Sequence, residues 1–172
     1  AMVAVSICGC SEKPAQSSAS ESSVTSDAGS VSESVSEASD SSTATGTAAE
    51  ITAKIKQDVK FPGMAEIGAD RMAGYYDVAA DKIDSYSAYI CGSGAYPDEI
   101  AVFKMKSADD VNAVKSVLEK RVESLSTTFK DYTPDEMYKI DGNNVVTSGN
   151  YVALIICADN AKAIEDFKSM AK

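Results

Sequence analysis

The sequence predicts an α+β fold: a single domain over residues 51–172, preceded by a disordered tether over residues 11–50. Three observations favour this arrangement. Segments with apolar residues at helical spacing alternate with short segments rich in aromatic and β-branched residues. Twice along the chain, two predicted strands are followed by a predicted helix. All 8 Tyr and all 4 Phe lie in the second part. We therefore expect a four-stranded, mostly antiparallel sheet built from two ββα units, with helices packed on one face.

The helices are predicted from apolar spacing and from capping residues. Ile51, Ile55 and Val59 recur every four residues and indicate a short helix that ends before Pro62. Ser107 opens a long helix with a capping pattern, and a stripe of Val and Leu residues continues to Leu125. The other predicted helices are 70–76, 134–139 with Pro134 in its first turn, and a last helix capped by Asp159 or Asn160.

The strands are predicted from composition and alternation. Residues 99–106 alternate in polarity and predict a strand with one buried face, whereas residues 151–157 are apolar and suit the sheet centre. Residues 83–91 and 145–147 complete the expected sheet. Residues 94–111 and 149–164 align as a weak internal repeat, which is why we expect two similar ββα units.

The first ten residues resemble the end of an export signal. They are small and apolar, lack a basic start, and are too short for a full signal, so residues 1–10 are interpreted as a truncated signal peptide. Ile7-Cys8-Gly9-Cys10 resembles a bacterial lipobox, which makes Cys10 the expected lipidation site, although Ala or Ser is commoner than Cys8. The alternative is an ordinary apolar N-terminus with incidental cysteines. The lipobox predicts a lipid anchor in the membrane.

Residues 11–50 have the composition of a spacer. They are rich in Ser, Thr, Ala and Glu and contain few large apolar side chains, so they cannot bury enough surface to offset the entropy of folding. We expect this tether to hold the domain away from the extracellular face of the cytoplasmic membrane.

The composition also excludes some functions. The net charge of −10 disfavours nucleic-acid binding, which needs clustered Lys and Arg. The absence of His excludes catalytic triads that use His and zinc sites that use imidazole. We expect no metal and no other cofactor.

Several segments resemble one family of bacterial lipoproteins, catalogued as domain of unknown function 4358 and found mainly in Gram-positive bacteria. The most specific segment is 94–104, Gly-Ala-Tyr-Pro-Asp-Glu-Ile-Ala-Val-Phe-Lys; weaker ones are 59–64, 75–78, 83–90 and 149–152. The resemblance implies an exported, lipid-anchored protein of unknown activity. It supplies no catalytic residue.

The loop 92–99 is the best candidate binding site. Its glycines make it flexible, and it carries Tyr96, Asp98 and Glu99, a combination that could bind a sugar ring, a peptide amine or a cation. The alternative is a hairpin connection whose acids are solvated and whose Tyr covers the core edge. Cys91 and Cys157 lie at strand ends and are either a disulfide or two small buried side chains.

We expect a membrane-anchored extracellular lipoprotein that acts as a binding or interaction module of the cell envelope. Its partner is an envelope protein or a glycan. The alternative is a carboxylate-dependent hydrolase that acts on envelope polymers. A solute-binding component of a transporter is a weaker interpretation, because such proteins usually close two lobes around their ligand.

Overall fold

The computed structural model describes residues 45–172. The predicted signal remnant, the lipobox with Cys10 and most of the predicted tether lie outside these residues. The elements are α1 (Ala48–Asp58), β1 (Met64–Glu66), α2 (Ala69–Tyr75), η1 (Ala80–Lys82), β2 (Ile83–Cys91), β3 (Glu99–Met105), η2 (Ala108–Asp110), α3 (Val111–Tyr132), η3 (Pro134–Lys139), β4 (Val145–Ser148), β5 (Tyr151–Ile156) and α4 (Asn160–Met170).

The sheet has five antiparallel strands in the order β1-β2-β3-β5-β4. The α+β class and the antiparallel sheet are confirmed, but the predicted count of four strands is wrong. The additional strand is β1, whose residues Met64–Glu66 pair with the end of β2. A strand of three residues is too short to show a periodic pattern, so the sequence gives no signal for it.

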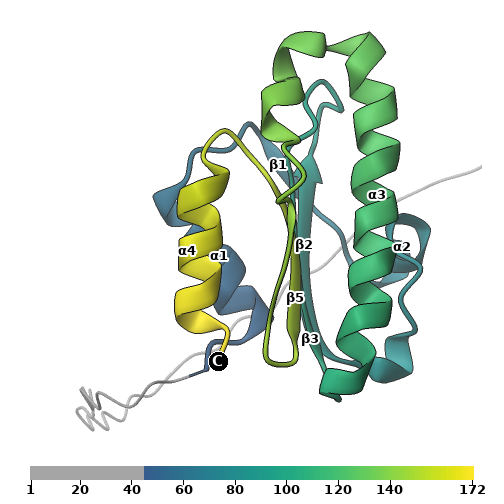
Figure 1. Cartoon of the computed structure of the whole chain (residues 1–172), viewed down its shortest axis with the longest axis vertical. Coiled ribbons are helices and arrows are strands. Elements are labelled where there is room, and N and C mark those ends of the chain that lie inside the picture. Colours follow the sequence, from purple (N-terminus) through teal and green to yellow (C-terminus); the bar gives the residue numbers. More distant parts are fainter. Residues whose placement is uncertain (1–44) are drawn as a thin grey trace, which may run out of the picture. The chain divides into compact units, whose positions relative to one another are not determined.

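Helices cover both faces of the sheet, and the prediction that they pack on one face is wrong (Figure 1). α2 and α3 lie on one side, and α1 and α4 lie on the other. The reason is that β3 and β5 are buried on both faces, and a strand without a polar side needs cover on each. The expectation that residues 99–106 form a half-buried strand is wrong for the same reason.

The two ββα units are not copies of each other in space. β3 and β5 are antiparallel neighbours at the centre of the sheet. A two-fold axis perpendicular to the sheet could relate these two strands. Such an axis would place both following helices on one face. α3 and α4 instead lie on opposite faces, so the weak repeat in sequence is not a structural symmetry.

Each face of the sheet has its own core. On the α3 side, Phe103 is fully buried, with its ring stacked on Tyr86 at 5.9 Å and edge-on to Tyr76 at 5.3 Å. On the α1 and α4 side, Ile55 and Phe167 are fully buried and pack against alternate residues of β3 and β5. The fold is therefore a three-layer sandwich around an antiparallel sheet.

The helix ends follow their capping residues closely. Thr47 and Glu50 form a capping box, so α1 begins at Ala48, and the last three residues assigned to the tether belong to this helix. Ser107 accepts a hydrogen bond from the Asp109 N–H and so caps the short η2, whereas α3 begins at Val111 without the predicted capping box. Asp159 caps α4 through the Lys162 N–H. None of the helices in residues 45–172 is long and apolar enough to cross a membrane.

The two ends of the sandwich differ in what they carry. At one end, which we call the entry end, the Gly46 N–H donates to the Met170 carbonyl at 3.1 Å and the Tyr151 hydroxyl donates to the Gly46 carbonyl at 2.8 Å. The chain therefore enters the domain beside its C-terminus. At the other end, the loop end, lie η3 and the β2–β3 loop (Figure 1).

Candidate functional site

Three tyrosines are exposed at the loop end. They are Tyr96 in the β2–β3 loop, Tyr132 at the last position of α3 and Tyr138 in η3, with 43%, 66% and 62% of their surface exposed. Within residues 45–172 these are the large apolar side chains that are exposed. We call this group the tyrosine tip. An aromatic group in water at one end of a domain is a common feature of recognition surfaces.

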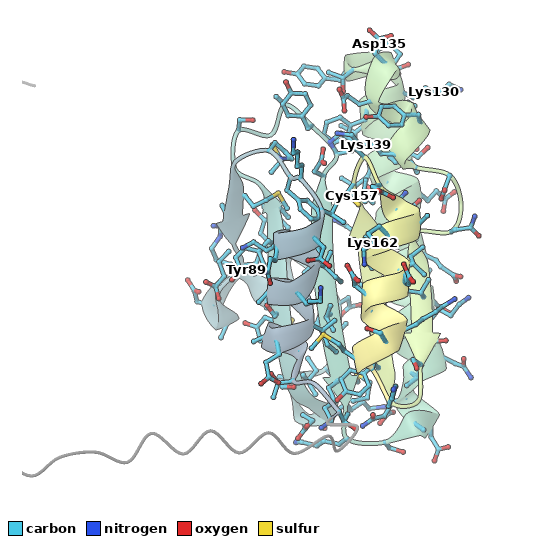
Figure 2. The ribbon with its side chains drawn as sticks, turned by 90° about the vertical axis from the view of Figure 1, so that its left-hand side faces the viewer. Tyr89, Lys130, Asp135, Lys139, Cys157 and Lys162 are labelled. Carbon is cyan, nitrogen blue, oxygen red and sulfur yellow. The ribbon has the colours of Figure 1, made fainter. Side chains whose placement is uncertain are left out.

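Lys139 lies beneath two of these rings. Its Nζ is 5.4 Å from the Tyr96 ring centroid and 5.8 Å from that of Tyr138, which are cation–π distances. The same Nζ lies 2.7 Å from Asp98 Oδ2 and 2.6 Å from Glu136 Oε2. The Lys139 side chain is only 8% exposed, so its ammonium group is almost completely enclosed by carboxylates and rings. Figure 2 shows Lys139 below Asp135, at this end of the molecule.

The backbone at Lys139 is fixed by two asparagines. The Lys139 carbonyl accepts hydrogen bonds from Asn144 Nδ2 at 2.8 Å and from Asn160 Nδ2 at 2.7 Å. Asn160 Oδ1 in turn accepts from the Cys157 N–H at 3.0 Å, which connects η3 to the end of β5 and the start of α4. The support of the tyrosine tip is therefore held by the sheet itself, and its geometry is fixed before any ligand arrives.

The charges under the tip do not balance. Two carboxylates, Asp98 and Glu136, face one ammonium group. Burial raises the pKa of Asp98, although the hydrogen bond and the charge of Lys139 act in the opposite direction. Asp98 Oδ1 is buried and has no hydrogen-bond partner within residues 45–172. The excess negative charge makes this end of the domain attractive to hydrogen-bond donors and cations.

Glu99 belongs to a different cluster. It follows Asp98 directly, and neighbouring residues of an extended chain point to opposite sides. Its carboxylate accepts a hydrogen bond from the Tyr76 hydroxyl at 2.8 Å and another from Arg121 Nη2, also at 2.8 Å. Arg121 Nε lies 3.3 Å from both carboxylate oxygens, so the pair is bidentate.

The predicted loop site is therefore divided by the sheet. Tyr96 and Asp98 meet around Lys139, whereas Glu99 lies on the α3 side with Arg121. The alternative of solvated acids does not hold either, because Asp98 and Glu99 are 2% and 1% exposed. The sequence did not indicate four residues that the fold brings to this end: Lys139, Glu136, Tyr132 and Tyr138. The pairing of Asp98 with Lys139 spans 41 positions, and no local pattern indicates it.

The two cysteines of the folded part are separate thiols. Cys91 and Cys157 are both free and buried, which supports the interpretation as small core side chains rather than a disulfide. Burial raises the pKa of the Cys157 thiol to about 11, so this group is protonated at neutral pH and a poor nucleophile. Among residues 45–172, no three Cys, Asp or Glu side chains gather closely enough to hold a metal ion.

A protein-family model matches most of the folded domain. The family model described as Domain of unknown function (DUF4358) matches residues 57–157, which extend from the end of α1 to the residue after β5. The tyrosine tip and Lys139 lie within this range. No curated protein and no solved structure matches the chain significantly. Because the match covers more than half of the 172 residues, the chain belongs to the DUF4358 family.

Proposed function

We propose that this protein is a lipoprotein, anchored to the extracellular face of the cytoplasmic membrane through Cys10, whose tyrosine tip binds a component of the cell envelope. The observation that carries the proposal is the placement of the tip. The exposed tyrosines gather at the loop end, whereas the chain enters the domain at Gly46, at the opposite end. The anchor and the binding surface thus use opposite ends of the sandwich.

The length of the domain and of the predicted tether suits a binding module that points away from the membrane. The 6 residues of β5 separate the two ends by about 20 Å at roughly 3.3 Å per residue. The tether that the composition of residues 11–50 predicts would add a root-mean-square reach of about 30 Å over the positions before Thr45, from roughly 5–6 Å × √n. The tip of an anchored domain would then lie well above the lipid surface, within reach of an envelope protein or a glycan.

The tip has the chemistry of a binding surface. Tyrosine offers a broad apolar ring and a hydroxyl group while losing little entropy on binding, and it is enriched at binding hot spots. Tyr96 and Tyr138 also pack near the fixed Lys139 ammonium, which limits their movement. The hydrolase alternative gains no support from the predicted carboxylates, because Asp98 and Glu99 are buried and each is paired with a cation.

The anchor is tested by Cys10→Ala in the full-length precursor. We expect the protein to move from the membrane fraction to the soluble fraction, because the thioether-linked lipid can no longer form. Fractionation of cells followed by immunoblotting measures this. Cys8→Ala is the matched control and is expected to leave the protein in the membrane. Retention of the Cys10→Ala protein in the membrane would contradict the anchoring proposal.

The tip is tested by replacing Tyr96, Tyr132 and Tyr138 with Ala in one variant. We expect its binding to isolated cell walls, or its crosslinking to an envelope protein in intact cells, to fall at least tenfold, because most of the apolar contact area is lost. The control is Lys54→Ala on α1, an element that carries none of the three tyrosines. Both variants are expected to unfold at nearly the wild-type temperature, since exposed substitutions change stability little. Equal binding by both variants would locate the activity elsewhere.

A further inference from the structure

A cleft outside the tyrosine tip lies between α3 and the segment that leads from η3 into β4. Its volume is about 410 Å³, within the range of small-molecule sites, which runs from roughly 300 to 1,000 Å³. Glu119, Val122 and Glu123 line it from α3, and Ile140, Asn144 and Val145 line it from the other side. None of the three tip tyrosines lines it.

The lining is apolar in part and acidic in part. Val122, Ile140 and Val145 are half-buried and pack against the α3-side core, so they provide a hydrocarbon surface. Glu119 and Glu123 stand one turn apart on α3, and carboxylates at this spacing lie side by side. Glu119 forms an ion pair with Lys115 at 2.5 Å, whereas Glu123 has no ion pair among the described residues.

Asn144 adds a hydrogen-bond acceptor that lacks a donor. This residue is 1% exposed, and its Nδ2 donates to both the Lys139 and the Ile155 carbonyls. Its Oδ1 is buried and has no hydrogen-bond partner in the described part of the chain. A buried acceptor without a donor is costly, and the negative partial charge of this oxygen adds to that of the Glu119 and Glu123 carboxylates along the cleft.

We propose that this cleft binds a small organic cation, a primary ammonium group on a short hydrocarbon body. The carboxylate of Glu123 attracts the charge, Val122 and Val145 contact the hydrocarbon, and the unpartnered oxygen of Asn144 behind the wall adds to the negative potential. A hard metal ion fits less well, because Ca²⁺ needs six to eight oxygen ligands and the apolar side of this cleft offers none. The proposal is independent of the function proposed for the tip.

The test uses the full chain and hexylammonium as the probe at neutral pH. Titration followed by two-dimensional amide NMR is expected to shift the resonances of Val122, Gly142 and Val145. Hexanol, which has the same hydrocarbon body without the charge, is expected to bind at least tenfold more weakly. Glu123→Gln is expected to weaken hexylammonium binding at least fivefold and to leave the unfolding temperature nearly unchanged, since the side chain is exposed.

Glu165→Gln is the matched control, because it removes the same charge from a side chain on α4 that is 76% exposed. It is expected to bind hexylammonium like the wild type, as is the triple tyrosine variant of the tip. Three results would overturn the proposal: no shift at these resonances with millimolar hexylammonium, equal affinity for hexanol, or an equal loss of affinity in Glu165→Gln. None of them bears on the tip, whose own assay uses cell walls and envelope proteins.

Discussion

Replacement of Lys139 by Met is expected to lower the free energy of unfolding by about 3–5 kcal/mol, the usual cost of breaking a buried ion pair from one side. Lys139 and Asp98 are both almost fully buried, with side chains 8% and 1% exposed. Without the ammonium group, Asp98 and Glu136 face each other uncompensated, and Asp98 must either stay charged in a poor environment or take up a proton. Urea unfolding followed by circular dichroism measures the loss.

The pH dependence of this loss of stability shows whether the uncompensated Asp98 carboxylate causes it. Burial already raises the pKa of Asp98 above its unfolded value, so the folded protein binds this proton more tightly than the unfolded chain does. The contribution of Asp98 to stability is therefore fully present below the unfolded pKa, near 3.9, and is lost as the pH rises through the folded pKa. Removal of Lys139 raises the folded pKa further. We expect the deficit of Lys139→Met to be smaller at pH 4 than at pH 7.

A double variant separates charge from packing. Lys139→Met combined with Asp98→Leu is expected to recover part of the loss, because the uncompensated carboxylate is gone. A deficit that is the same at both pH values and is not reduced by the second change would show that the uncompensated Asp98 carboxylate is not the cause of the loss.

Replacement of Arg121 by Met is expected to cost about 2–4 kcal/mol. Glu99 is 1% exposed and loses its bidentate partner, although the Tyr76 hydroxyl still donates to it. The expected cost is below that for Lys139 because the Arg121 side chain is 24% exposed and water can partly replace it. Thermal and urea unfolding measure the effect. Lys115→Met is the control, because its pair with Glu119 is exposed and is expected to contribute less than about 1 kcal/mol.

The Arg121 variant also decides the role of Glu99. If Glu99 only stabilises the fold, Arg121→Met and Glu99→Gln lower the unfolding temperature and leave cell-wall binding at its wild-type level below that temperature. A loss of binding without a loss of stability would instead return Glu99 to the binding site, where the sequence analysis placed it beside Tyr96 and Asp98.

The sequence predicted the elements better than it predicted their arrangement. Periodic apolar residues and caps such as Ser107 and Asp159 act locally, so α1, α3, α4 and the four longer strands were recognisable. The face that each helix covers depends on long-range packing. A strand that is apolar on both sides would have indicated helices on both faces of the sheet. In β3 the polar Lys104, and Lys106 just after it, hid this pattern.

The candidate site was predictable only in part for a similar reason. The loop 92–99 was identified from its own Gly, Tyr and acidic residues, and Tyr96 does lie at the exposed loop end of the molecule. Lys139 and Tyr138 reach that end through the fold of η3 after a 22-residue helix. No spacing in the sequence connects them with Tyr96. Site residues that lie in one loop could be predicted from the sequence. Those that the topology brings together from distant segments could not.

The position of Gly46 beside Met170 has a mechanical consequence. A pull on the chain at Thr45 reaches the domain first through the hydrogen bonds of Thr45 and Gly46 to the C-terminal residues, and then through α1. α1 contributes no strand to the sheet, so its detachment would break side-chain packing but no ladder of backbone hydrogen bonds. Under tension α1 would therefore peel away before the sheet yields.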